Sequence, residues 1–137
     1  GDVVFSWSGS LAVVVWCGGR AALNQHLFRV TSKASPKWFI LQWLHEHLPE
    51  FQRIAGDKAT TMGHIQRHHL AAAKCVVPDR LILDAASHVF GPQLERRVAL
   101  DLESRQLARL RDELLPRLMS GTLAVGPLVD GQGATDG

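Results

Sequence analysis

The sequence predicts an α+β fold: a small mixed β-sheet with packed helices, followed by a long C-terminal helical arm. Two observations lead to this class. Before Pro36, short β-rich runs alternate with turns that contain Gly and Ser, and beyond Pro78 the pattern is helical almost to the end. We therefore expect a compact part over residues 1–78, a helical spacer over residues 79–121 and a flexible tail over residues 122–137.

Four short runs predict the strands. Residues 2–7 are rich in β-formers and lead into the turn Ser8-Gly9-Ser10. Residues 11–17 form a continuous Val-rich run, which suits a strand covered on both faces. Residues 27–30 combine apolar and basic side chains and predict another strand. Residues 75–77 predict a short buried strand that a proline stops.

From Lys37 onward, apolar residues recur at spacings of three and four, which predicts a helix. Pro49 lies near the predicted end of this helix, and a second helical segment is expected before Gly56. A helical turn that includes Leu70 is expected to dock on the sheet.

The helical spacer begins at Asp79, a side chain suited to an N-cap. Its first helix is predicted over residues 81–90, because Gly91-Pro92 breaks the pattern and Pro92 suits the first turn of the next helix. Pro116 ends the regular pattern, and Gly121 is placed as the C′ residue of a last turn.

A leucine seam marks the second helix of this region. Leu100, Leu107 and Leu114 are spaced by sevens, and Leu110 lies between the last two. An amphipathic stripe of this kind has to be buried, and the small compact part cannot cover all of it. We therefore expect a helical partner, either in the same intact subunit or in a second copy of the fragment.

The charge is unevenly distributed along the chain. The net charge of +2 is too small to indicate nucleic acid by itself. Residues 1–77, however, hold eight Lys and Arg against four acids and six of the seven histidines, whereas residues 78–137 hold seven Arg against nine acids. The compact part is therefore basic and the helical part acidic.

The cysteines and the lengths of the apolar runs bear on the cellular compartment of the protein. Cys17 and Cys75 lie in or beside apolar runs, where a reduced Cys behaves as a small hydrophobe. No apolar run in the first half reaches the length of a membrane span, and no signal peptide is recognised at Gly1. We expect a cytoplasmic protein, and the start without Met suggests a piece of a longer chain.

The loop over residues 56–64 is the main candidate for a DNA-binding site. Lys58 is expected to contact phosphate, Thr60 and Thr61 to donate or accept hydrogen bonds, and Gly63 to allow a close backbone approach. The alternative is an ordinary surface loop in which a threonine caps the helix that follows.

Two further segments carry polar residues suited to DNA contacts. Asn24 and Gln25 are the residue types that pair bidentately with adenine, and His26 follows them. Ser8 and Ser10 form a second group. Turn chemistry explains either group equally well. Trp7 and Trp16 are expected to be structural, because duplex DNA keeps its bases stacked.

The histidines after the loop raise the question of zinc. His64 and His68 are four residues apart, but Ile65 stands where a metalloprotease would have Glu, and no third ligand is evident. Cys75 is interpreted as a core residue. We therefore expect no metal, and assign His64 and Arg67 to DNA contacts instead.

Four strings, in this order along the chain, carry a family resemblance: GDVVFSWSGS (1–10), LNQHLF (23–28), ATTMGHI (59–65) and LRDELLPRLMSG (110–121). Together they resemble the specificity subunit of type I restriction–modification systems. The resemblance covers nearly the whole chain except its tail. It identifies residues 1–78 with the C-terminal portion of a target-recognition domain and residues 79–121 with the helical spacer that follows it.

The resemblance implies a non-catalytic DNA-recognition subunit. In that family, each recognition domain reads half of a split DNA sequence from the major groove. The helical regions form an antiparallel coiled coil that sets the spacing and docks the modification subunits, which methylate adenine with S-adenosylmethionine. The restriction subunit cleaves DNA with ATP. This chain lacks the first half of its recognition domain and the whole partner domain.

The residues also bear on two other classes of function. An enzyme is disfavoured because the sequence has no Gly-rich cofactor loop and no paired carboxylates beside a lysine in its basic half; no cofactor is expected. A helical protein-interaction adaptor without specific DNA binding is the alternative, since the leucine seam suits it.

Overall fold

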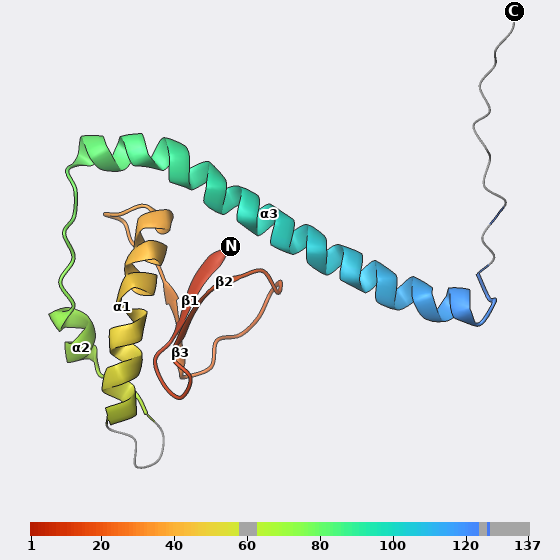
Figure 1. The fold of residues 1–137 in the computed structure, drawn as a ribbon, viewed down its shortest axis with the longest axis horizontal. Coiled ribbons are helices and arrows are strands. Elements are labelled where there is room, and N and C mark those ends of the chain that lie inside the picture. Colours follow the sequence, from red (N-terminus) through yellow and green to blue (C-terminus); the bar gives the residue numbers. More distant parts are fainter. Residues whose placement is uncertain (58–62, 124–125, 127–137) are drawn as a thin grey trace, which may run out of the picture. The chain divides into compact units, whose positions relative to one another are not determined.

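The computed structural model describes residues 1–57, 63–123 and 126. The described residues form a three-stranded sheet and three helices (Figure 1), which confirms the α+β class and the long C-terminal helix. The elements are β1 (Asp2–Ser6), β2 (Ala12–Trp16), β3 (Leu27–Val30), α1 (Lys37–Asp57), α2 (Arg67–Ala72) and α3 (Arg80–Met119). The chain divides into two compact units, Gly1–Leu102 and Glu103–Gly137.

The sheet is antiparallel with the order β2-β1-β3, so the prediction of a mixed sheet was wrong. β1 and β2 form a hairpin with Val4 opposite Val14. The chain then crosses to the other edge of β1, where β3 runs antiparallel to β1 with Val4 opposite Arg29. β1 is therefore the central strand, and both of its neighbours are edge strands.

One face of the sheet packs on helix α1 and holds the core, which includes Val3, Phe5 and Val13. The expectation that residues 11–17 are covered on both faces was wrong, because Val14 on the opposite face is 46% exposed. An antiparallel sheet can leave one face in solvent, and here the helical cover comes from one side only.

Helix α1 supplies the other half of the core through Leu41, Leu44, Phe51 and Ala55. It runs without interruption through Pro49, so the predicted break into two helices was wrong. A proline inside a helix costs about 3 kcal/mol. Continuing the helix buries Phe51 and Ala55, which offsets that cost because a buried Phe side chain contributes about 1.5–3 kcal/mol.

The predicted helical turn that includes Leu70 is present as the short helix α2, and Leu70 packs against the core that the sheet and α1 share. Ile65 is buried just before α2. The start of α2 is closed by Gln66, whose backbone N–H donates to Nδ1 of His69 at 2.9 Å and whose carbonyl accepts from the backbone N–H of His69 at 3.0 Å.

The segment between α2 and α3 is not a strand, and the predicted buried strand over residues 75–77 was wrong. Val76 is 91% exposed, and Cys75 is exposed rather than part of the core. Cys17 is buried, and both thiols are free. The segment is held on α1 instead, because Nε2 of His47 lies 3.2 Å from the carbonyl oxygen of Lys74 while Nδ1 lies 3.0 Å from that of Trp43.

In the first unit, helix α3 begins at Arg80, and Asp79 caps it as predicted, because its Oδ1 accepts from the backbone N–H of Ile82 at 2.9 Å. Trp38 of α1 stacks on Phe90 with ring centroids 4.9 Å apart and donates from Nε1 to Oγ of Ser87 at 2.8 Å. Leu94 also packs against the core.

The helix runs on through Gly91 and Pro92, so the predicted break there was wrong. Phe90 precedes Gly91-Pro92 and Leu94 follows them, four residues further on, so both lie on the same face of α3. An unbroken helix therefore allows Phe90 to stack on Trp38 while Leu94 packs against the core.

In the second unit, α3 continues past Pro116, where its end was predicted, and stops at Met119. Gly121 has a φ of 71°, the left-handed conformation expected of a C′ glycine. Thr122 Oγ1 donates to the carbonyl of Arg117 at 3.1 Å and closes the helix end. Most of the predicted tail, residues 124–125 and 127–137, lies outside the described residues. None of the described helices has an apolar stretch long enough to cross a bilayer.

Candidate DNA-binding surface

Three segments proposed for DNA contacts from the sequence meet around Trp7, at the end of strand β1. They are residues 8–10, 24–26 and 63–64. We call Trp7 and these three segments the Trp7 junction. Lys58, Thr60 and Thr61, the other predicted contacts of the loop, lie outside the described residues.

Backbone hydrogen bonds assemble the junction. The N–H of Trp7 donates to the carbonyl of His26 at 3.2 Å, and the carbonyl of Trp7 accepts from the N–H of Ile65 at 3.1 Å. The N–H of Gly9 donates to the carbonyl of Gly63 at 2.9 Å, and Ser8 and His64 form an antiparallel bridge. The pairing of β1 is thus extended on both sides beyond its last residue.

The Trp7 side chain connects the same segments. Its ring centroid lies 5.7 Å from that of His26, 6.0 Å from that of Phe28 in a stacked arrangement and 6.2 Å from that of His64, edge to face. Its indole Nε1–H donates to the backbone carbonyl of Gln25 at 3.2 Å. The prediction that Trp7 is structural is confirmed, since it also packs against the core. Its residue type alone did not indicate that it also positions the polar residues around it.

The two amide side chains of the turn over residues 24–26, Asn24 and Gln25, make different contacts. Oδ1 of Asn24 accepts from the backbone N–H of His26 at 2.9 Å, and its carbonyl accepts from the N–H of Leu27 at 3.2 Å. This is an Asx-turn. The side chain of Gln25 is exposed, and its Nε2 lies 3.2 Å from Nε2 of His26.

Gly63 has a packing role that the sequence did not indicate. A Cβ at this position would lie 2.5 Å from the carbonyl oxygen of Ala55 on α1. Real Cβ atoms do not come so close, so only glycine lets this segment pass α1 and reach Ser8 and Gly9. A hollow of about 400 Å³ adjoins the contact, and Ser10 lines it together with Gln52.

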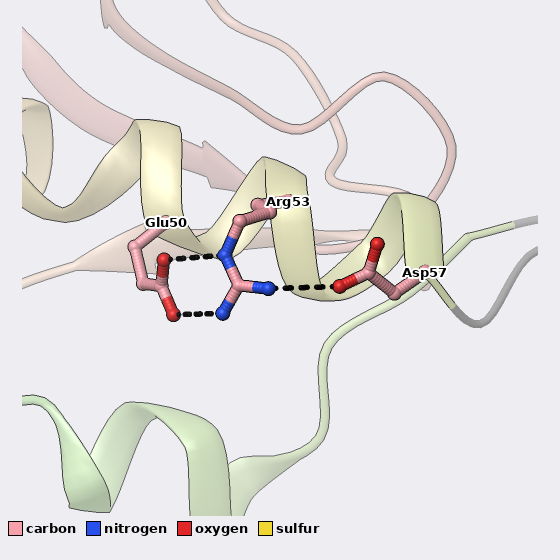
Figure 2. A network of polar contacts seen from close by, with 3 residues as sticks. All are labelled: Glu50, Arg53 and Asp57. Atoms are coloured by element: carbon pink, nitrogen blue, oxygen red, sulfur yellow. Dashed lines mark hydrogen bonds and ion pairs between the residues drawn. The ribbon is translucent and has the colours of Figure 1, made fainter.

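Figure 2 shows that the guanidinium of Arg53 already contacts two carboxylates, those of Glu50 and Asp57. Its guanidinium binds both carboxylate oxygens of Glu50, at 2.9 and 2.7 Å, and Oδ2 of Asp57 at 2.9 Å. The hydrogen bond and charge of Arg53 hold the pKa of Glu50 below its ordinary value, and the pKa of Arg53 is raised by Glu50 first and by Asp57 next. All three side chains are exposed.

Arg67 differs from Arg53 in its surroundings. It lies at the start of α2, three residues after His64, and it is exposed. Within the described part of the chain, Arg67 and Arg20 make no ion pair. Each can therefore supply a full positive charge to an anionic ligand.

The histidines after the loop are arranged in separate places. His64 pairs with Ser8, whereas His68 and His69 lie on α2 with ring centroids 3.9 Å apart. The helix begins at Arg67, so His64 and His68 do not share a helical face. In residues 1–57, 63–123 and 126, no group of three His, Cys, Asp or Glu side chains could hold a metal ion.

The leucine seam lies on an exposed face of α3. Its members are 37% to 58% exposed: Leu100, Leu107, Leu110 and Leu114.

Comparison of the chain with protein-family models, with curated proteins and with solved structures gives no match.

Proposed function

We propose that this chain recognises double-stranded DNA by sequence, as a non-catalytic part of a type I restriction–modification specificity subunit in the cytoplasm. The observation that carries the proposal is the Trp7 junction. Ser8, Asn24, Gln25, His26 and His64 are distant in sequence and lie together at one end of the sheet. Groups fixed on a scaffold in this way lose little freedom on binding.

The chemistry of the junction suits a duplex. Exposed amides can pair with base edges in the major groove, and imidazoles can contact phosphate oxygens. Arg67 and Arg20, which make no ion pair with the residues that the structure describes, add positive charge in the same basic part of the chain. In the proposed role, modification and restriction subunits methylate and cleave the DNA that this chain selects, and the chain needs no cofactor.

Salt dependence of DNA binding tests the proposal. Duplex binding by the chain is measured by fluorescence anisotropy while salt is raised from about 50 to 200 mM, over which a protein with many phosphate contacts loses affinity steeply. Arg67→Gln should lower the slope of log affinity against log salt by about 1 and weaken binding to all sequences alike.

Arg53→Gln is the matched control. It removes the same charge from a guanidinium that Glu50 and Asp57 already neutralise, so the slope should stay at its wild-type value. Failure to form any complex with duplex DNA across the salt range would contradict the proposed function.

A helical protein-interaction adaptor is a second candidate, favoured by the exposed leucine seam. In the first proposal the same seam packs on a helix of the intact subunit or of a second copy. The anisotropy experiment separates the two, because an adaptor without DNA binding gives no specific complex at any salt concentration.

A further inference from the structure

We propose that Gln25 is the base-reading side chain of the Trp7 junction and that it reads an adenine. The inference rests on the proposed function and makes it more specific. Asn24 and Gln25 are the two side chains of the junction whose chemistry suits a bidentate contact with adenine. Their surroundings in the structure separate them.

Asn24 is used to build the turn. Its Oδ1 accepts from the backbone N–H of His26 at 2.9 Å, and this bond fixes the amide against its own backbone. A bidentate contact needs the oxygen and the nitrogen of one amide directed together at one base edge. Turning Asn24 toward a base would break the Asx-turn that presents Gln25 and His26.

Gln25 lies at the tip of this turn, and its backbone is held in place. Its carbonyl oxygen accepts the indole N–H of Trp7 at 3.2 Å. Trp7 in turn is paired on both sides through its own backbone groups, to His26 and Ile65. The Cα of Gln25 is thus tied to the sheet, although its side chain is exposed.

His26 orients the amide of Gln25. The two Nε2 atoms lie 3.2 Å apart, while Nδ1 of His26 is buried and has no hydrogen-bond partner among the described residues. A side-chain amide has two N–H groups and two oxygen lone pairs, and the contact with His26 uses one of these four. At least one N–H and one lone pair remain, and adenine requires these two for its N7 and its N6–H.

Selection of binding sites from random duplexes, with the complete chain, tests the inference. The wild-type chain should select one position as adenine that depends on Gln25. Gln25→Glu keeps the size of the side chain but loses the N–H, so discrimination for adenine at that position should fall by about 5- to 150-fold, with cytosine gaining because its N4–H can donate to a carboxylate.

Two controls sharpen the result. Asn24→Asp keeps the acceptor that closes the turn, so its added negative charge should weaken binding to all sequences alike while the preference at that position stays unchanged. Replacing the selected adenine by 7-deazaadenine removes N7, so the wild type should lose affinity on this duplex while Gln25→Glu should not. Circular dichroism and thermal unfolding of each variant confirm that it is folded.

The outcomes distinguish this inference from the proposed function. Salt-dependent, sequence-selective binding in which Gln25→Glu keeps the wild-type preference overturns the reading of adenine by Gln25 and leaves the proposed function standing. A change of preference in Asn24→Asp alone overturns it in favour of Asn24. If the wild-type chain forms no complex with duplexes at any salt concentration, both fail.

Discussion

Helices α1 and α3 both run through proline and both place apolar residues at spacings of three and four, yet their surroundings differ. Helix α1 buries Leu41, Leu44, Phe51 and Ala55, whereas in α3 only Leu83 is buried among the described residues. Apolar spacing therefore indicates that a helix has a face to cover, and the rest of the chain decides whether it is covered.

The two helices should differ most in how much the free energy of unfolding falls when a large apolar side chain is replaced by Ala. Phe51→Ala should lower the free energy of unfolding by about 3–5 kcal/mol, because Phe51 is 1% exposed and packs against Phe5 and Trp43. Leu107→Ala, at a 58% exposed position of α3, should change it by less than about 0.5 kcal/mol. Urea denaturation of dilute protein measures both values. Equal costs would show that the seam of α3 is already buried in solution.

The contact of α1 with the Trp7 junction gives the next largest effect. Gly63→Ala should destabilise the protein by about 1–3 kcal/mol, since its Cβ would be forced against the carbonyl oxygen of Ala55. Gly56→Ala is the matched control in α1. None of the described residues lies within 4 Å of its added Cβ, so this variant should gain up to about 1 kcal/mol from helix propensity. Thermal unfolding compares the two, and equal stability of the variants would exclude the close contact.

The smallest expected effect is on the pH dependence of stability and comes from Glu50 on the exposed surface of α1. The hydrogen bond from Arg53 lowers the pKa of Glu50 below its ordinary value of 4.5. A lowered folded-state pKa contributes stability that is present above pH 4.5 and is lost as the pH falls below it. Glu50→Gln should therefore lower the melting temperature slightly at neutral pH, and the difference from wild type should disappear in acid, as the pH falls well below 4.5.

Glu46→Gln is the control for this measurement, because Glu46 is an exposed acid of the same helix that makes no ion pair with the described residues. Its melting temperature should stay close to that of the wild type at both pH values. A difference between Glu50→Gln and wild type that persists in acid would have a cause other than ionisation.

Much of the fold could be predicted because its signals are local. The β-rich runs at residues 2–7 and 27–30 became β1 and β3, and the helical spacing from Lys37 marked the start of α1. Asp79 and Gly121 marked the two ends of α3 through an N-cap bond and a left-handed φ. Each depends on the conformation of a few neighbouring residues.

The candidate site was predictable only as separate pieces. Ser8, Asn24, Gln25, His26 and His64 were chosen for their chemistry, but nothing in their spacing showed that they lie together. Trp7 brings them together, and its residue type predicted a structural role without naming its partners. Gly63 is predicted from the sequence to allow a close backbone approach to DNA, whereas in the structure it allows a close approach to the carbonyl oxygen of Ala55. Nothing in the sequence relates these two segments.

The sequence by itself determined the start of α1 at Lys37, the approximate positions of β1 and β3 and the apolar stripes of the helices, since these follow from residue type and periodicity. The tertiary structure alone decided that α1 continues through Pro49, that α3 continues through Pro92 and that residues 75–77 are exposed. The physical reason is that these outcomes depend on contacts between distant segments. Burial of Phe51 and Ala55, for example, offsets the local cost of the proline before them.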